Sequence, residues 1–220
     1  MDKHEPLAAR VHQRTLEVGI LLFPEVEILD FAGPYEVFSV AARVARRDRL
    51  LAHDAFRLRS IAAERTLIRA RHGLRLMADA DFADEPACDL LIVPGGVVDQ
   101  PLSDPATLAW VRQAAAQAAV TASVCTGAFI LAEAGLLAGQ RVTTHWEDIA
   151  DLRSRYPDLT VAESVPFVDL GATLTSAGIS AGIAMSLHLV ARILGPQAAR
   201  ATARQMQYDW TDSVQPLGGG

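Results

Sequence analysis

Cys125 is the residue in this chain with the clearest capacity for chemistry. Residues 119–124 read as a short buried strand, and residues 126–133 have the pattern of a helix. Cys125 falls at the corner between them, where a side chain is held out over the end of a sheet, as in a nucleophile elbow. The free backbone N–H groups that open the helix favour thiolate over thiol. The position predicts a cysteine nucleophile, and a buried structural thiol is the alternative.

A glycine pair follows another buried segment of the chain. Residues 88–93 form an apolar run that ends in Pro94-Gly95-Gly96. Glycines let backbone N–H groups approach a ligand closely. Gly95 and Gly96 are therefore candidate oxyanion-hole donors facing Cys125. A tight turn explains the same residues without a function. Cys88, at the start of this run, is read as structural.

Two more side chains that could carry protons follow predicted strands. Asp30 opens a predicted helix at 30–46, in which Pro34 falls in the first turn. An N-cap explains an aspartate there, and spacing alone favours it. The alternative is a proton carrier at the same sheet edge as Cys125. His145, which Trp146 follows, is either a base for Cys125 or a cap of the next helix.

The elements that must position these residues alternate between strand and helix. This alternation predicts an α/β fold: a doubly wound, mostly parallel sheet flanked by helices, a flavodoxin-like three-layer sandwich. Functional residues gather at the carboxyl ends of the strands in such a sheet. We expect a single domain over 16–210, a flexible N-terminal tail over 1–15 and a C-terminal tail over 211–220. The predicted strands are 16–23, 56–63, 88–93, 119–124, 141–144 and two or three within 160–175, and the other predicted helices are 105–118, 147–156, 180–194 and 197–208.

Composition limits the classes of function. A chain of 220 residues with 50% hydrophobic content suits one substantial domain. Its net charge of −6 gives no reason to expect nucleic acid as a partner. Two cysteines exclude a disulfide scaffold and a cysteine-rich zinc site. No apolar run approaches the roughly 20 residues that span a bilayer, and the first 15 residues lack the apolar core of a signal peptide. The expected partner is a small molecule, and the expected location is the cytoplasm.

Four motifs together resemble the ThiJ/PfpI superfamily, which shares the class I glutamine amidotransferase-like fold. The Cys-Thr-Gly-Ala core at Cys125, with Thr-His-Trp downstream, is similar to a subgroup of this superfamily. That subgroup contains isocyanide (isonitrile) hydratases and the sensor-like domains of some AraC-type regulators. The motifs are LLFPEVEILDFAGPYEVF at 21–38, LLIVPGG at 90–96, SVCTGAFILAEAGLLAGQRVTTHW at 123–146 and TSAGISAGIAMSLHLV at 175–190.

The resemblance implies roles for individual residues. It makes Cys125 the nucleophile and, by alignment on Asp-Phe-Ala-Gly-Pro, makes Asp30 the general acid/base, which reverses the preference from spacing. It also implies backbone donors at Gly96 and Thr126, no metal, no organic cofactor, and a homodimer. Further candidates for lining the site are His145, Trp146, Gly178 and Ile179.

Three departures from the superfamily pattern bear on the substrate. Val97-Val98-Asp99 stands where hydratase relatives often carry a further glycine, and Ala184 stands where they often carry aspartate. Both changes concern substrate identity rather than the nucleophile. Protease and amidase members place histidine directly after the cysteine, so Thr126 argues against that branch.

The leading functional expectation is a lyase, a cofactor-free isocyanide hydratase. The Cys125 thiolate would attack the terminal carbon, and Asp30 would protonate that carbon to give a thioimidate. Water would then release an N-substituted formamide, so that a covalent intermediate divides one hydration into two steps. One alternative is glyoxalase-like or deglycase-like action on reactive carbonyls with the same two side chains. Another is a ligand-sensing or redox-sensing domain, since an exposed thiolate oxidises readily; the absence of a basic helical extension before Gly220 disfavours a DNA-binding regulator.

Overall fold

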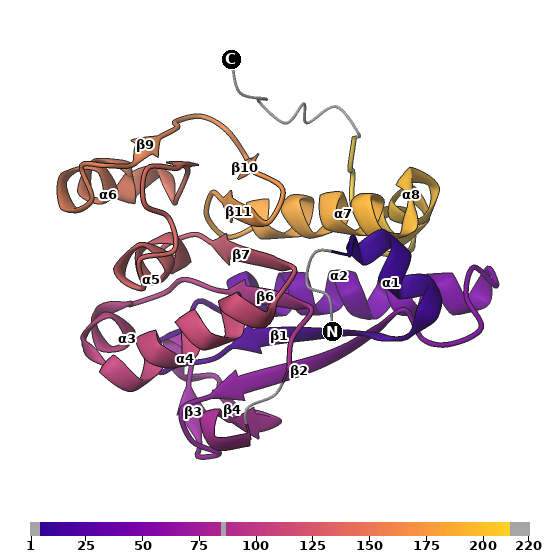
Figure 1. The fold of residues 1–220 in the computed structure, drawn as a ribbon, viewed down its shortest axis with the longest axis horizontal. Coiled ribbons are helices and arrows are strands. Elements are labelled where there is room, and N and C mark those ends of the chain that lie inside the picture. The colour runs from indigo at the N-terminus through magenta and orange to yellow at the C-terminus, as the bar shows by residue number, and fades with distance from the viewer. Residues whose placement is uncertain (1–4, 85–86, 212–220) are drawn as a thin grey trace.

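The computed structural model describes residues 5–84 and 87–211 (Figure 1). Its central sheet has the strand order β10-β11-β7-β6-β1-β2-β5. Neighbouring strands pair in parallel, except that β10 is antiparallel to β11. The predicted doubly wound, mostly parallel sheet is confirmed. The strands are β1 Leu16–Leu21, β2 Phe56–Ala62, β5 Ala80–Asp81, β6 Leu90–Val93, β7 Val120–Val124, β10 Phe167–Asp169 and β11 Thr173–Ser176.

Helices cover both faces of this sheet (Figure 1). One face packs against α1 Leu7–Gln13, α2 Ile28–Arg47, α7 Ala181–Leu194 and α8 Pro196–Gln205. The other packs against α3 Asp99–Ser103, α4 Pro105–Gln117 and α5 Gly127–Glu133. None of the helices in the described residues is long and apolar enough to cross a membrane. The smaller elements are β3 Ile68–Arg69 paired with β4 Arg75–Leu76, β8 Arg141–Val142 paired with β9 Thr160–Val161, helix α6 Ile149–Arg155, and the 3-10 helices η1 Arg71–Gly73, η2 Phe82–Asp84 and η3 Trp146–Asp148.

The central strands are apolar on both faces because both faces are covered. Ile20 packs into the cluster beneath α2 and α7, and the next residue, Leu21, packs into the cluster beneath α4 and α5. All four residues of β6 are buried. A strand in this position has no solvent-facing side, so its sequence shows a continuous apolar run instead of alternation.

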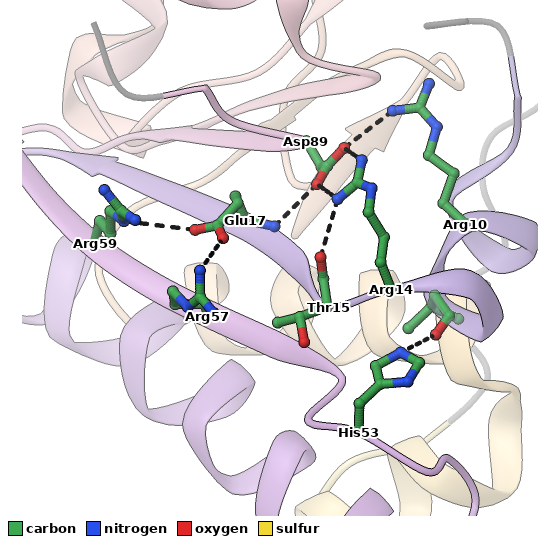
Figure 2. A network of polar contacts seen from close by, with 9 residues as sticks. Arg10, Arg14, Thr15, Glu17, His53, Arg57, Arg59 and Asp89 are labelled. Atoms are coloured by element: carbon green, nitrogen blue, oxygen red, sulfur yellow. Dashed lines mark hydrogen bonds and ion pairs between the residues drawn. The ribbon is translucent and has the colours of Figure 1, made fainter. Parts of the chain in front are cut away.

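The prediction of a flexible N-terminal tail over residues 1–15 is wrong for the helix α1. Leu7 and Val11 are buried, and Arg10 is only 3% exposed. Arg10 and Arg14 both bind the Asp89 carboxylate, with N–O distances of 3.0 and 2.7 Å (Figure 2). The contacts that hold this helix join it to a carboxylate 75 or more positions away, so no local pattern indicates it. Residues 1–4 and 212–220, which include most of the expected C-terminal tail, lie outside the described residues.

The first long helix begins earlier than predicted. Helix α2 starts at Ile28, and the Glu27 side chain accepts a hydrogen bond from the Ile28 N–H at 3.2 Å. Asp30 is therefore not the N-cap but lies in the first turn. Pro34 lies in the second turn rather than the first, where its ring nitrogen cannot donate to the Asp30 carbonyl. Helix α3 was not predicted.

The strand order brings three loops to one edge of the sheet. β6 lies between β1 and β7, so the loop that follows it lies between the loops that follow the other two. From β1, the chain continues to β2 on one side and later returns to β6 on the other. This change of direction opens a crevice at the carboxyl ends, which is where ligands bind in open α/β sheets.

Candidate active site

Cys125 lies on a sharp turn between β7 and α5. Its φ of 57° is in the left-handed region, which is uncommon for any residue other than glycine. Hydrogen bonds hold both of its backbone groups. The Cys125 N–H donates to the Ser176 carbonyl at 3.1 Å, and the Thr144 hydroxyl donates to the Cys125 carbonyl at 2.8 Å. The residue is 7% exposed. The structure thus has a strained, fixed elbow at the corner identified from sequence.

The two residues after Cys125 fasten the elbow to the β6 loop. A Cβ on Gly127 would lie 2.1 Å from the Val93 carbonyl oxygen, so only glycine fits at this position. The Thr126 hydroxyl accepts the Gly96 N–H and donates to the Gly96 carbonyl, both at 2.9 Å. The elbow and the glycine loop therefore form one hydrogen-bonded unit.

Asp30 reaches the same unit from the start of α2. It is fully buried, and its Oδ2 accepts the Gly95 N–H at 3.1 Å. Its Oδ1 is buried and has no hydrogen-bond partner among the described residues. A Cβ on Gly95 would lie 3.0 Å from Oδ2 and 2.5 Å from the Thr126 hydroxyl oxygen. The site therefore leaves one carboxyl oxygen of Asp30 available for a proton or a ligand.

Burial sets the protonation of this aspartate. Loss of solvent raises the pKa of Asp30 to about 7, and the negative charge of Glu27 acts in the same direction. The Gly95 N–H opposes the rise, as do the nearby Cys125 side chain and the Ile179 N–H. A carboxyl group with a pKa near 7 can both accept and release a proton at neutral pH.

The helix start favours thiolate at Cys125, as expected, but other contributions dominate in the resting site. Burial, together with the negative charge of Asp30, raises the pKa of the Cys125 thiol to about 12. The Thr126 N–H favours thiolate, as the sequence suggested, but it is outweighed. The thiol therefore holds its proton at neutral pH and needs a base to remove it. The Asp30 carboxyl group acts on this thiol through its charge and through a side-chain hydrogen bond.

The two glycines expected to supply oxyanion donors are already engaged. The Gly95 N–H donates to Asp30, and the Gly96 N–H donates to the Thr126 hydroxyl. Their expected role at a reacting oxygen stays a prediction. What the structure gives them is a positioning role, since they join the acid, the loop and the elbow.

The remaining candidates line a groove of about 690 Å³ beside the reactive pair. His145, Trp146, Gly178 and Ile179 all contribute to it. The His145 ring packs so closely on Gly178 that a Cβ there would lie 2.0 Å from the ring Cδ2. The charged partners of His145 are Asp148 at 3.4 Å and Glu147 at 3.8 Å, both measured from Nδ1. In the described part of the chain no hydrogen bond or ion pair joins His145 to Cys125.

Sequence reasoning missed several contributors to the site. Thr144, Glu27 and Asp148 act on the reactive pair through a hydrogen bond to the elbow or through charge. Thr144 lies within the Thr-His-Trp motif, which is the sequence signal that points to it. Cys88 is buried, and burial raises the pKa of its thiol to about 12. Within residues 5–84 and 87–211, no group of three or more potential ligands could hold a metal ion.

Comparison with known proteins gives a consistent picture. The DJ-1/PfpI family matches residues 17–192. The isonitrile hydratase of Pseudomonas putida is 36% identical over 88% of this chain and 78% of its own length. The HTH-type transcriptional regulator CdhR of Pseudomonas aeruginosa is 32% identical over 84% of this chain, which spans 53% of that protein. The crystal structure of a ThiJ/PfpI family protein from Pseudomonas syringae superposes with a TM-score of 0.77 and 25% identity, covering 99% of this chain and 83% of the other. The chain belongs to the DJ-1/PfpI family.

Proposed function

We propose that the protein is a cofactor-free, cysteine-dependent hydratase that converts isocyanides to N-substituted formamides. The similarity to an isonitrile hydratase over most of the chain supports this proposal. The reactive pair supports it independently, because hydration of an isocyanide requires a nucleophile and a proton carrier. Cys125 and Asp30 have those two roles, and Thr126 positions both through the glycine loop.

The first step adds the Cys125 thiol across the isocyanide carbon. The Asp30 carboxylate takes the thiol proton as sulfur forms a bond to the terminal carbon. The same carboxyl group, through its unbonded Oδ1, then delivers that proton to the carbon. The product is a thioimidate, Cys–S–CH=N–R. The proton lost by sulfur is the proton gained by carbon, so the step balances without an outside acid.

The second step hydrolyses the thioimidate. Asp30, now ionised again, takes a proton from water as the water oxygen bonds to the thioimidate carbon. Asp30 passes this proton to the nitrogen. The carbon–sulfur bond then breaks as the proton of the new hydroxyl group moves to sulfur, again through Asp30. This releases R–NH–CHO and restores the Cys125 thiol. The two steps together add one water to one isocyanide.

Both glycine N–H groups already donate hydrogen bonds within the protein. This observation favours an isocyanide over a carbonyl compound as the substrate. Attack on a carbonyl places negative charge on oxygen, which needs free donors nearby. Attack on an isocyanide places the electron pair on carbon, where a proton is needed instead. A fully buried carboxyl group with a pKa of about 7 can supply that proton. Glyoxalase-like or deglycase-like chemistry is therefore less well matched to this site.

The test is formamide production from cyclohexyl isocyanide by the parent protein and by Cys125→Ala. We expect turnover in the parent and loss of at least about a thousandfold in the variant, because the covalent route is removed. Cys88→Ala is the matched control, since it removes the other buried thiol and should keep turnover. Equal rates in the parent and Cys125→Ala would refute the proposal.

A ligand-sensing domain is the second candidate. The observation that favours it is the similarity to the transcriptional regulator CdhR, of which this chain spans about half. The groove beside Cys125 would then bind a small molecule without converting it to a product. Absence of formamide, together with saturable binding of a small molecule that depends on the site, would favour this candidate.

The remaining expectations concern assembly and location. By family resemblance we propose a homodimer, so light scattering should return about twice the chain mass of 23.6 kDa. A mass near that of one chain would contradict it. The cytoplasmic location stays a prediction, to be checked by fractionating cells that express the protein.

A further inference from the structure

The groove adjoins Cys125 and Asp30 through two of its lining residues, although neither Cys125 nor Asp30 lines it. Thr144 lines the groove and donates its hydroxyl hydrogen bond to the Cys125 carbonyl. Ile179 also lines it, and its backbone N–H stabilises the Asp30 carboxylate. A molecule whose reacting carbon is at Cys125 would therefore have this groove next to its substituent.

Two large apolar side chains line the groove and are exposed to solvent. Trp146 is 74% exposed and Ile179 is 40% exposed. Ile179 also holds a φ of 50°, which is a strained conformation for a β-branched residue. Exposed aromatic surface and local backbone strain at one place are features of binding sites. A volume of about 690 Å³ falls within the range of small-molecule pockets.

The charge of the groove is negative on balance. Arg153 and Glu163 form an ion pair and offset each other. Glu147 also lines the groove, whereas Asp148 lies outside its lining, 3.4 Å from Nδ1 of the lining residue His145. The negative charge of Asp148 also acts on Cys125 and raises the pKa of its thiol. An anionic group entering here would meet repulsion that a neutral group would not.

We propose that this groove is the subsite for the substituent of the substrate, and that it selects neutral apolar groups over groups carrying a carboxylate. The inference rests on the proposed function, because it assumes that the reacting carbon is at Cys125. It assigns contact with the substituent to Trp146 and Ile179, and rejection of anions to Glu147 and Asp148.

The apolar part of the proposal is tested with substrates of two sizes. The ratio of kcat/KM for cyclohexyl isocyanide to that for methyl isocyanide is measured in the parent, in Trp146→Ala and in Met77→Ala. We expect the ratio to fall roughly tenfold in Trp146→Ala through loss of apolar contact. Met77 is also exposed, at 63%, but lies outside the groove, so its variant should keep the parent ratio. An unchanged ratio in Trp146→Ala would overturn the subsite.

The charge part is tested with substrates of similar shape. Ethyl isocyanoacetate is neutral, whereas the isocyanoacetate ion carries a carboxylate. We expect the parent to prefer the ester by at least about tenfold at low salt, and the preference to shrink in Glu147→Gln and at high ionic strength. Equal kcat/KM for the two substrates in the parent would overturn the charge selection.

A binding measurement separates failure of the subsite from failure of the proposed function. Calorimetry of N-cyclohexylformamide with the parent and with Trp146→Ala needs no turnover. If no isocyanide is hydrated but the formamide binds and Trp146→Ala weakens it, the subsite stands without the hydratase. If isocyanides are hydrated but neither the ratio nor the binding depends on Trp146, the hydratase stands without the subsite.

Discussion

The protein raises the pKa of both Cys125 and Asp30 above the ordinary values of these side chains. Burial keeps the Cys125 thiol protonated and raises the pKa of Asp30 until it exchanges protons near neutrality. In the mechanism that we propose, Asp30 accepts the proton that the Cys125 thiol must lose. Burying an ionisable carboxyl group also destabilises the fold whenever that group is charged.

The catalytic role that we propose for Asp30 predicts a pH dependence of activity. Because the carboxylate must accept the thiol proton, kcat/KM should rise with pH through about 7. Asp30→Asn keeps an oxygen for the Gly95 N–H but should lose about 10²–10⁴-fold in rate and the pH dependence with it. Glu27→Gln removes a charge that raises the pKa of Asp30, so its profile should shift to lower pH. An Asn variant as active as the parent would disprove the assignment.

The same residue predicts a pH dependence of stability. The folded pKa of Asp30 is raised, so its contribution is fully favourable below the ordinary value of 3.8 and is lost as the pH rises through about 7. The shift corresponds to at most on the order of 4 kcal/mol. In urea unfolding, Asp30→Asn should be more stable than the parent at pH 8, with a smaller difference at pH 5. A difference that does not change with pH would contradict this account.

At the scale of elements, the site depends on loops that approach one another closely. Gly96 has a φ of 136° and forms a bridge with Val26 in the loop after β1. The Glu27 N–H donates to the Gly95 carbonyl at 2.9 Å, and the Val97 N–H donates to the Glu25 carbonyl at 3.1 Å. The loop after β6 is thus held on one side by the loop that leads to Asp30 and on the other by Thr126.

This contact predicts a specific requirement for glycine. A Cβ on Gly96 would lie 2.3 Å from the Glu25 carbonyl oxygen, so Gly96→Ala should destabilise the fold by about 3 kcal/mol or more and reduce activity. Gly171→Ala is the matched control, since Gly171 also has a positive φ, of 87°, but open space around it. It should cost about 1 kcal/mol and leave activity unchanged. Equal losses of stability in thermal or urea unfolding would show that the positive φ alone, without the close contact to Glu25, explains the requirement for glycine at position 96.

At the scale of the whole molecule, a charged cluster at the opposite end of the sheet joins distant parts of the chain (Figure 2). Asp89 immediately precedes β6 and accepts hydrogen bonds from Arg10, Arg14 and the Glu17 N–H. Burial raises the pKa of this carboxyl group, but these donors outweigh burial and hold it below its ordinary value. The cluster therefore fastens α1 to the central strands.

Removing the charge of Asp89 should weaken the whole fold. Asp89→Asn leaves the buried Arg10 cation without its carboxylate, at an expected loss of about 3 kcal/mol in unfolding free energy. Because the folded pKa of Asp89 is depressed, the stabilisation is present above pH 3.8 and is lost as the pH falls below it. The exposed pair of Asp54 with Arg46 gives the control, as Asp54→Asn should change stability little. Similar losses in the two variants would refute a special role for the buried cluster.

The features that depend on local order could be predicted before the structure was known. The apolar run before Cys125 and the Thr-Gly pair after it indicate the elbow, and the alternation of strands and helices indicates the sheet. These signals are readable because side chain periodicity and glycine placement reflect the conformation of a few neighbouring residues.

The effects of these residues on one another follow from packing between distant parts of the chain. That β6 lies between β1 and β7 is a fact of packing, and it puts the two glycine N–H groups on Asp30 and Thr126 instead of leaving them free. Burial then raises the pKa of Cys125, which local sequence had predicted to fall. The position of helix α1 likewise depends on a distant residue, because Arg10 and Arg14 bind Asp89. Contacts, desolvation and charge arise between residues far apart in the chain, so no local pattern can report them.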